Sequence, residues 1–152
     1  MVEKIVSGGQ TGVDRAALDA ALEAGIPCGG WCPKGRRAED GKIPRIYPLE
    51  ETSSADYPQR TEFNIQDSDG TLILAWGSPQ GGTLLTLKLA GKHRKPFLLI
   101  DLARGGDASR VREWIQSRAI RVLNVAGPRE SEAPGIRERA LSLLREVFRE
   151  KP

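Results

Sequence analysis

The stretch that decides the fold is "IVSGGQTGVDRAAL", which runs from Ile5 to Leu18. A short apolar run leads through a glycine-rich turn into a stretch of helical character, which is typical of a strand that passes into a helix. Consecutive glycines let backbone N–H groups approach a ligand, and the first turn of a helix presents unpaired donors. The segment therefore predicts a strand, turn and helix suited to holding an anion.

The same alternation of strand-sized apolar runs and helical stretches continues along the chain, which indicates a parallel α/β sheet. We predict strands near residues 3–7, 26–31, 70–76, 96–101 and 121–126. We predict helices near residues 12–24, 56–68, 82–92, 107–118 and 133–149. The pattern indicates a single domain over residues 1–152, a three-layer α/β/α structure. Its mainly parallel sheet would have about five strands in the order 2-1-3-4-5.

Composition narrows the class of ligand. The chain has 152 residues and a formal net charge of +3, which favours anionic ligands. A basic stripe with interleaved aromatic residues is absent, so nucleic acid is not an expected partner. The longest apolar runs, such as "TLILAW" and "PFLLI", are strand-sized rather than ~20 residues, so no membrane span or signal peptide is expected. We predict a cytoplasmic protein with a small anionic ligand.

Cysteine and histidine chemistry has little support. Cys28 and Cys32 lie in "CGGWC", too far apart for a disulfide unless the two glycines fold the chain back. We expect free thiols and no metal site, since a metal would need more ligands than this pair. The single histidine, His93, lies where a helix ends before a strand, at the face away from the expected crevice. His-assisted Ser or Cys catalysis is therefore not expected.

The opening loop fits neither standard phosphate-binding fingerprint. A Rossmann fingerprint would place glycines at Ser7, Gly9 and Gly12, so the first is replaced by serine. No acidic residue stands at the end of the second predicted strand to hold a ribose. A Walker loop would need lysine where Val13 follows the last glycine. A classical NAD site and Walker-type ATP hydrolysis are therefore not expected.

Several loops are nevertheless predicted to converge, because ligands of open parallel sheets bind outside the carboxyl ends of the strands. "GSPQGGT" forms a second glycine turn before a helix, and cations come from the segments "PKGRR" and "AGPRES". Helix 56–68 has a polar face that looks either into solvent or into the crevice. The predicted ligand-binding residues are Gly8, Gly9, Gln10, Thr11, Gly12, Asp14, Lys34, Arg36, Thr61, Asn64, Gly81, Gly82, Thr83, Gly127 and Arg129.

Asp14 conflicts with a simple anion site. A carboxylate beside a phosphate would repel it by ~1 to 4 kcal/mol at 4 Å. Either Thr11 and Asp14 form a capping box with Asp14 turned back to the backbone, or Asp14 faces a hydroxyl, an amine or a metal. Asp14, Glu62 and Asp67 are candidates for a catalytic carboxylate, and Asp14 is the leading one. Residues 33–58 form a long connection, which is functional or disordered in most compact domains and here is a candidate lid.

Longer motifs carry a family resemblance. "GGQTGVDRAALDAALEAGIPCGGWCPKGRRAEDGKIP", "TEFNIQDSDGTLIL", "GGT" and "LNVAGPRESEAPGI" follow one another in the chain. Together they resemble the molybdenum carrier protein family, whose members are similar to the molybdenum-cofactor carrier protein of algae. The resemblance implies a Rossmann-like fold related to the lysine-decarboxylase-like proteins, and homo-oligomers. It also implies that the ligand is molybdopterin or a similar phosphorylated heterocycle.

One departure from related proteins bears on catalysis. The related nucleoside-phosphate hydrolases carry a catalytic glutamate three positions after the threonine of their glycine motif, and Thr86 stands there in "GGTLLT". General acid or base catalysis contributes ~10² to 10⁴-fold, so a hydrolase without this carboxylate would be badly impaired. The leading hypothesis is a molybdenum-cofactor carrier that binds a phosphorylated ligand. The alternative is a nucleotide-processing enzyme that hydrolyses an N-glycosidic or phosphoester bond.

Overall fold

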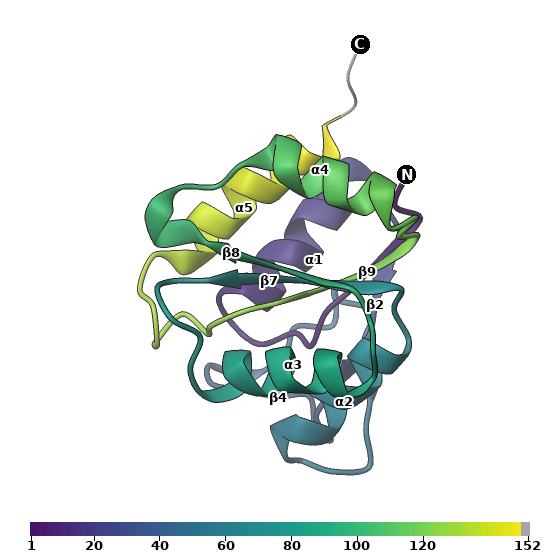
Figure 1. Cartoon of the computed structure of the whole chain (residues 1–152). Helices are drawn as coiled ribbons and strands as arrows, with labels where there is room; N and C mark the ends of the chain where they lie inside the picture. The colour runs from purple at the N-terminus through teal and green to yellow at the C-terminus, as the bar shows by residue number, and fades with distance from the viewer. Residues whose placement is uncertain (150–152) are drawn as a thin grey trace.

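A five-stranded parallel sheet forms the middle layer of the computed structural model, which describes residues 1–149 (Figure 1). Its strands are β1 (Lys4–Val6), β2 (Cys28–Gly29), β7 (Gly70–Ala75), β8 (Phe97–Asp101) and β9 (Val122–Ala126). One face of the sheet is covered by helices α1 (Val13–Ala24), α4 (Ala108–Ser117) and α5 (Ile136–Phe148). The other face is covered by α2 (Tyr57–Gln66) and α3 (Gly81–Lys92). A 3-10 turn, η1 (Leu102–Arg104), follows β8. The predicted Rossmann-like three-layer α/β fold is confirmed.

The place of the last strand differs from the prediction. Hydrogen-bonded neighbours run β2-β1-β9-β7-β8, so the five strands counted along the chain stand in the order 2-1-5-3-4. The predicted order 2-1-3-4-5 is wrong. β9 pairs with β1 on one side and β7 on the other, while β8 lies at an edge, where Phe97 is 43% exposed. Local sequence does not encode this order, because the run in β8 is more apolar than that in β9, which contains Asn124.

The main core lies between the sheet and helices α1, α4 and α5. Ile5, Leu72 and Leu123 point from the sheet into this layer, and each is fully buried. The last helix contributes a stripe at the spacing that the sequence predicts for a core helix, formed by Ile136, Ala140, Leu143, Leu144 and Val147. This layer anchors the sheet and leaves the carboxyl ends of its strands free to form a site.

The second predicted strand is broken by a glycine. Gly30 has φ 127°, and a Cβ there would lie 2.5 Å from the Ser7 carbonyl oxygen. The chain therefore leaves the main sheet after β2 and continues as β3 (Trp31–Cys32), which pairs in parallel with β6 (Glu50–Glu51) in a separate two-stranded sheet. The predicted strand 26–31 is thus shared between two sheets.

The long connection 33–58 is folded against α1. It contains a hairpin of β4 (Arg37–Ala38) and β5 (Gly41–Lys42). A second apolar cluster joins it to α1 and β3 and consists of Leu18, Cys32, Ala38, Ile43, Tyr47 and Leu49. Asp40 receives a bidentate pair of hydrogen bonds from Arg15 of α1, at 2.6 and 2.8 Å. The connection therefore has a core and charged anchors of its own.

Two further predictions concern single features of the chain. Cys28 and Cys32 are free thiols, as predicted, and burial raises the pKa of both. Within residues 1–149, no helix is both long enough and apolar enough to cross a membrane.

Candidate functional site

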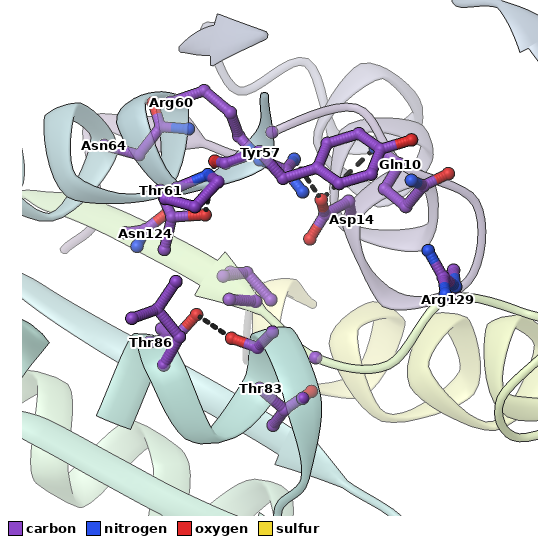
Figure 2. Close-up of a pocket in the computed structure, with 18 of the residues that line it drawn as sticks. Gln10, Asp14, Tyr57, Arg60, Thr61, Asn64, Thr83, Thr86, Asn124 and Arg129 are labelled. Atoms are coloured by element: carbon purple, nitrogen blue, oxygen red, sulfur yellow. Dashed lines mark hydrogen bonds and ion pairs between the residues drawn. The ribbon is translucent and has the colours of Figure 1, made fainter. Parts of the chain in front are cut away.

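A cavity of about 330 Å³ opens at the carboxyl ends of β1 and β9 (Figure 2). Its walls are the loops after these two strands, the polar face of α2 and the first turns of α3. This is where ligands of open parallel α/β sheets bind. The lining residues are Gly8, Gln10, Asp14, Tyr57, Pro58, Arg60, Thr61, Asn64, Gly81, Gly82, Thr83, Leu85, Thr86, Asn124, Val125, Ala126, Gly127, Arg129 and Glu132.

Asp14 and Arg60 form a buried ion pair in the cavity wall (Figure 2). Arg60 Nη1 donates to Asp14 Oδ2 at 3.0 Å, and the backbone N–H of Gln10 donates to the same oxygen at 3.2 Å. The side chains of Arg60 and Asp14 are only 12% and 7% exposed. Burial raises the pKa of Asp14, and the charge of Arg60 opposes that rise.

This arrangement decides the conflict that the sequence raises at Asp14. The capping box is wrong, because Gly12 occupies the N-cap of α1 and no side chain caps that helix. Thr11 instead donates its hydroxyl to Glu39 and accepts the Glu130 N–H at 3.2 Å. Asp14 does turn back to a backbone N–H, and its carboxylate also pairs with Arg60. Its negative charge is therefore compensated within the cavity wall.

The polar face of α2 looks into the cavity rather than into solvent. Arg60, Thr61 and Asn64 line the cavity at helical spacing, and Asn64 is buried. The Asn64 side chain is fully engaged with the backbone of Trp31, accepting from its N–H at 2.8 Å and donating to its carbonyl at 3.0 Å. Asn64 therefore holds β3 against α2, while Thr61 and Arg60 are the groups that this face offers to a ligand.

The first turn of α3 forms the opposite wall. No side chain caps this helix, and Gly81 and Gly82 at its start are exposed. A helix with an uncapped first turn presents unpaired N–H groups and a positive dipole end. Thr83 is buried beside them, and Thr86, one turn on, donates its hydroxyl to the Gly82 carbonyl at 2.9 Å. Among the cavity walls, this turn is the one best suited to an oxyanion.

Arg129 stands at the rim of the cavity between two carboxylates. Its Nε lies 3.1 Å from Glu132 Oε1 and 3.4 Å from Glu39 Oε2, and its side chain is 40% exposed. Glu39 comes from the turn between β4 and β5, so this contact ties the 33–58 connection to the loop after β9. Arg129 is thus a partly exposed cation whose charge is shared by two carboxylates.

The opening loop contributes less to the cavity than its sequence indicates. Gly8 and Gln10 line the cavity, but Gly9 and Gly12 do not. Both adopt left-handed φ angles, 79° and 78°, in places where a side chain has no room. A Cβ on Gly9 would meet Leu49 at 2.5 Å, and one on Gly12 would meet the Pro128 carbonyl oxygen at 2.4 Å. These two glycines serve the packing of the loop.

Two of the predicted cations lie elsewhere. Lys34 is exposed, outside the residues that line the cavity. The Arg36 guanidinium is bonded to four carbonyl oxygens of its own connection, those of Ile43, Pro44, Tyr47 and Leu49. Arg36 therefore organises the connection. A clamp by Lys34 or Arg36 does not fit this structure, because neither residue lines the cavity.

The structure adds residues that the sequence argument did not assign to the site. Arg60 and Tyr57 come from α2, and Asn124 comes from β9. The signal for Arg60 was present, since it lies on the same helical face as Thr61 and Asn64. Asn124 carries a weaker signal, a polar residue inside an apolar strand. Its Nδ2 donates to Thr71 at 3.2 Å, and its oxygen receives no donor from residues 1–149.

Metal and histidine chemistry gain no support at this site. The part of the chain that the structure describes holds no cluster of three His, Cys, Asp or Glu side chains suited to a metal. His93 ends α3 and lies 3.2 Å from Glu62, outside the cavity lining.

Comparison with known proteins assigns the chain to a family. The model of the circularly permutated YpsA SLOG family matches residues 5–148. The chain belongs to this family. Counting strands from β9 makes β9 first, β1 second, β2 third, β7 fourth and β8 fifth, so the sheet reads 3-2-1-4-5. That is the beginning of the Rossmann order, and it agrees with a permuted member of the family.

A solved structure is similar over nearly the whole chain. It is described as the crystal structure of "Putative molybdenum carrier protein" from Syntrophus aciditrophicus SB, and its sequence is 49% identical to this chain. The TM-score is 0.94, and the match covers 98% of this chain and 96% of that one. The resemblance drawn from the sequence is therefore confirmed. A search of curated proteins finds no match.

Proposed function

We propose that this protein is a carrier that binds a small phosphorylated heterocycle of the molybdopterin type in the cavity at the carboxyl ends of β1 and β9. The observation that carries the proposal is the uncapped first turn of α3, which opens into the cavity opposite an arginine-bearing helix face. The name of the similar crystallised protein favours the same cargo. A cavity of about 330 Å³ is within the ~300–1,000 Å³ usual for small-molecule sites.

Phosphate binding is assigned to the start of α3. Gly81 and Gly82 supply backbone N–H donors, Thr83 supplies a hydroxyl, and the helix dipole favours a negative charge there. Gly127 lets the loop after β9 approach closely, since a Cβ at this position would lie 2.2 Å from the Leu74 carbonyl oxygen. Arg129 supports the anion from the rim.

The heterocycle is assigned to the amide groups beyond the phosphate. Gln10 Oε1 accepts from the N–H groups of Thr11 and Glu39, so its amide nitrogen remains as a donor. The free oxygen of Asn124 is an acceptor. A donor and an acceptor fixed by the protein fit a ring that carries both a carbonyl and an amine group.

Binding without catalysis is the reading that the side chains favour. Thr86 stands where related hydrolases carry glutamate, and its hydroxyl is committed to the Gly82 carbonyl. Asp14, the remaining carboxylate in the deep wall, is held by Arg60 and by the Gln10 N–H. Both of these hydrogen bonds go to Oδ2 and tie the carboxylate to the cavity wall. Homo-oligomers and a cytoplasmic location remain predictions.

The test is binding measured together with product analysis. Native mass spectrometry of freshly purified protein, before and after addition of molybdopterin, should show one bound pterin per chain, and oxidation should release a fluorescent pterin. Nucleoside monophosphates incubated with the protein should release no base and no phosphate. Absence of pterin binding together with release of base would establish the nucleotide-processing enzyme instead.

Gly82→Asp is the matched variant for this test. A Cβ at Gly82 has no heavy atom within 4 Å, so the side chain fits, and an acidic residue in the first turn stabilises a helix. The added carboxylate would compete with the phosphate, so the variant should fold as the wild type does and lose the pterin. Gly82→Ala adds only a methyl group, so this variant should still bind the pterin.

A further inference from the structure

Arg60 has far more donor capacity than the protein uses. It carries five N–H donors, and the single hydrogen bond that it makes to residues 1–149 is the one from Nη1 to Asp14. Its Nε is buried and has no partner in that part of the chain. Buried donors in native proteins are nearly always paired. Arg60 lines the cavity, so the terminal N–H donors that Asp14 does not use are open to an acceptor from outside the protein.

The surroundings hold Arg60 in place for this role. Gly8 leaves room for it, since a Cβ there would lie 1.7 Å from Arg60 Nη1. The Arg60 guanidinium carbon also lies over the Tyr57 ring, 5.3 Å from its centre. Asp14 fixes the guanidinium by its 3.0 Å contact. The side chain is therefore oriented before any ligand arrives, which reduces the entropy that binding must overcome.

Arg129 is less available, although its place in the loop after β9 made it the more obvious choice. Its Nε, like that of Arg60, makes no hydrogen bond of good geometry within residues 1–149, but it lies between two carboxylates, Glu132 and Glu39, and its side chain is 40% exposed. Arg60 has a single carboxylate partner and is 12% exposed. Water screens an exposed charge and a second carboxylate offsets it, so the buried guanidinium attracts an anion more strongly.

We propose that Arg60 is the principal side-chain ligand of the anionic group of the cargo, and that Asp14 is its positioning residue. The inference rests on the proposed function. It makes Arg60, rather than the candidate catalytic residue Asp14, the side chain that decides which ligand the cavity binds. Without ligand, Asp14 compensates the buried charge. With ligand, the unused N–H donors of Arg60 bind the oxyanion while Nη1 keeps its contact with Asp14.

The two roles predict opposite effects of the two neutralising substitutions. Arg60→Gln removes the charge and most of the donors, so affinity for an oxyanion should fall about ten- to a hundredfold. Asp14→Asn keeps a side-chain oxygen that can accept from Nη1 but leaves the guanidinium without a counter-charge, so an anion should stabilise this variant more than it stabilises the wild type. A merely structural ion pair would lower binding in both variants.

The experiment measures thermal unfolding of the wild type and the variants against inorganic phosphate, with chloride at equal ionic strength, and then against molybdopterin. We expect each ligand to raise the melting temperature of the wild type, to raise that of Asp14→Asn more, and to raise that of Arg60→Gln little or not at all. Arg60→Lys keeps the charge without the planar fork and should be intermediate. The double variant Asp14→Asn, Arg60→Gln replaces the ion pair by two amides, so it controls for loss of folding. Neither phosphate nor molybdopterin should raise its melting temperature.

The outcomes separate the two proposals. If Arg60→Gln binds molybdopterin as tightly as the wild type while Gly82→Asp does not, the role of Arg60 is overturned and the carrier function stands. If Asp14→Asn loses binding as Arg60→Gln does, the pair is structural and the inference is also overturned. If the wild type responds to neither probe, both proposals are overturned.

Discussion

Gly8 and Gly127 line the same cavity, and they lack side chains for different reasons. A Cβ on Gly8 would collide with the guanidinium end of the Arg60 side chain rather than with backbone. A Cβ on Gly127 would lie 2.2 Å from the Leu74 carbonyl oxygen and 2.6 Å from Val13, which belong to the backbone and the core. Neither glycine has a positive φ angle, so sterics alone decide what an alanine does at each position.

Gly8→Ala and Gly127→Ala should therefore separate binding from stability. Gly8→Ala displaces the Arg60 guanidinium and strains its pair with Asp14, so molybdopterin affinity should fall about tenfold. The loss of stability should be smaller than for Gly127→Ala, because a side chain can shift where a backbone cannot. Gly127→Ala strains the packing of β7 against α1 and should cost about 1–3 kcal/mol of unfolding free energy. Urea denaturation and a binding titration on both variants check this. Equal loss of stability in the two would contradict it.

Asp69 predicts a dependence of stability on pH. Its Oδ2 accepts the N–H groups of Val122 and Arg121 at 2.8 and 3.0 Å, and these bonds, led by the one from Val122, lower its pKa. A carboxyl with a lowered folded pKa stabilises the fold above its unfolded pKa of about 4, and this contribution is lost as pH falls through the folded pKa.

The Asp69→Asn variant should accordingly be less stable than the wild type at pH 7. The difference should shrink as the pH falls below about 4, because protonated Asp69 no longer offers a charge to the two N–H groups. Urea denaturation at pH 7, 5 and 3 measures it. A difference that stays constant over this range would show that the charge of Asp69 is irrelevant.

At the scale of elements, the connection 33–58 behaves as part of the scaffold. It shares an apolar cluster with α1, and Glu39 in its β4–β5 turn contacts Arg129 at the cavity rim. The sequence allowed a lid here. A lid would need few buried contacts, whereas Ile43 is 2% exposed and Tyr47 donates to Asp19 at 2.6 Å.

Arg36→Gln should loosen this connection without emptying the site. The four carbonyl groups that accept from Arg36 would lose a charged partner. A hydrogen bond to a charged group contributes about 1.5–3 kcal/mol to the free energy of unfolding. We expect faster amide hydrogen exchange and protease cleavage within residues 33–58, and molybdopterin affinity within about threefold of the wild type. Unchanged exchange there, or loss of the ligand, would contradict this.

At the scale of the whole molecule, the strand order reflects a permutation. β9 lies between β1 and β7 although it is the last strand of the chain, and counted from β9 the sheet has the Rossmann order. A helix that follows a parallel strand returns the chain to the amino ends of the strands. The end of α5 and the start of β1 therefore lie at the same edge of the sheet, as Figure 1 shows.

A permuted chain that begins before β9 should fold to the same structure. The cut falls between Arg118 and Ala119, in the exposed turn after α4, and a short flexible linker joins the present ends. Every strand pair and the cavity are kept, so we expect the same circular dichroism spectrum, a melting temperature within about 5 °C and unchanged molybdopterin binding. A chain that stays unfolded would show that β9 must be added last.

Much of this molecule followed from the sequence. Glycine turns and the alternation of strands and helices gave the α/β class, the approximate element bounds and the edge of the sheet where the site lies. Gly81, Gly82 and Thr83 were placed in the cavity wall because a helix start after a parallel strand always faces that edge. These features depend on local patterns, which a single chain displays directly.

The rest depended on contacts between residues far apart in the chain. The sequence by itself determined which glycines and charges stand near the carboxyl ends of the strands, because local propensity sets turns and helix starts. Only the tertiary structure decided that β9 is inserted next to β1, that Arg36 is bound by its own connection, and that Arg60 compensates Asp14 from 46 positions away. Burial, pairing and the partner of a buried charge are properties of the packed fold, and no local pattern carries them.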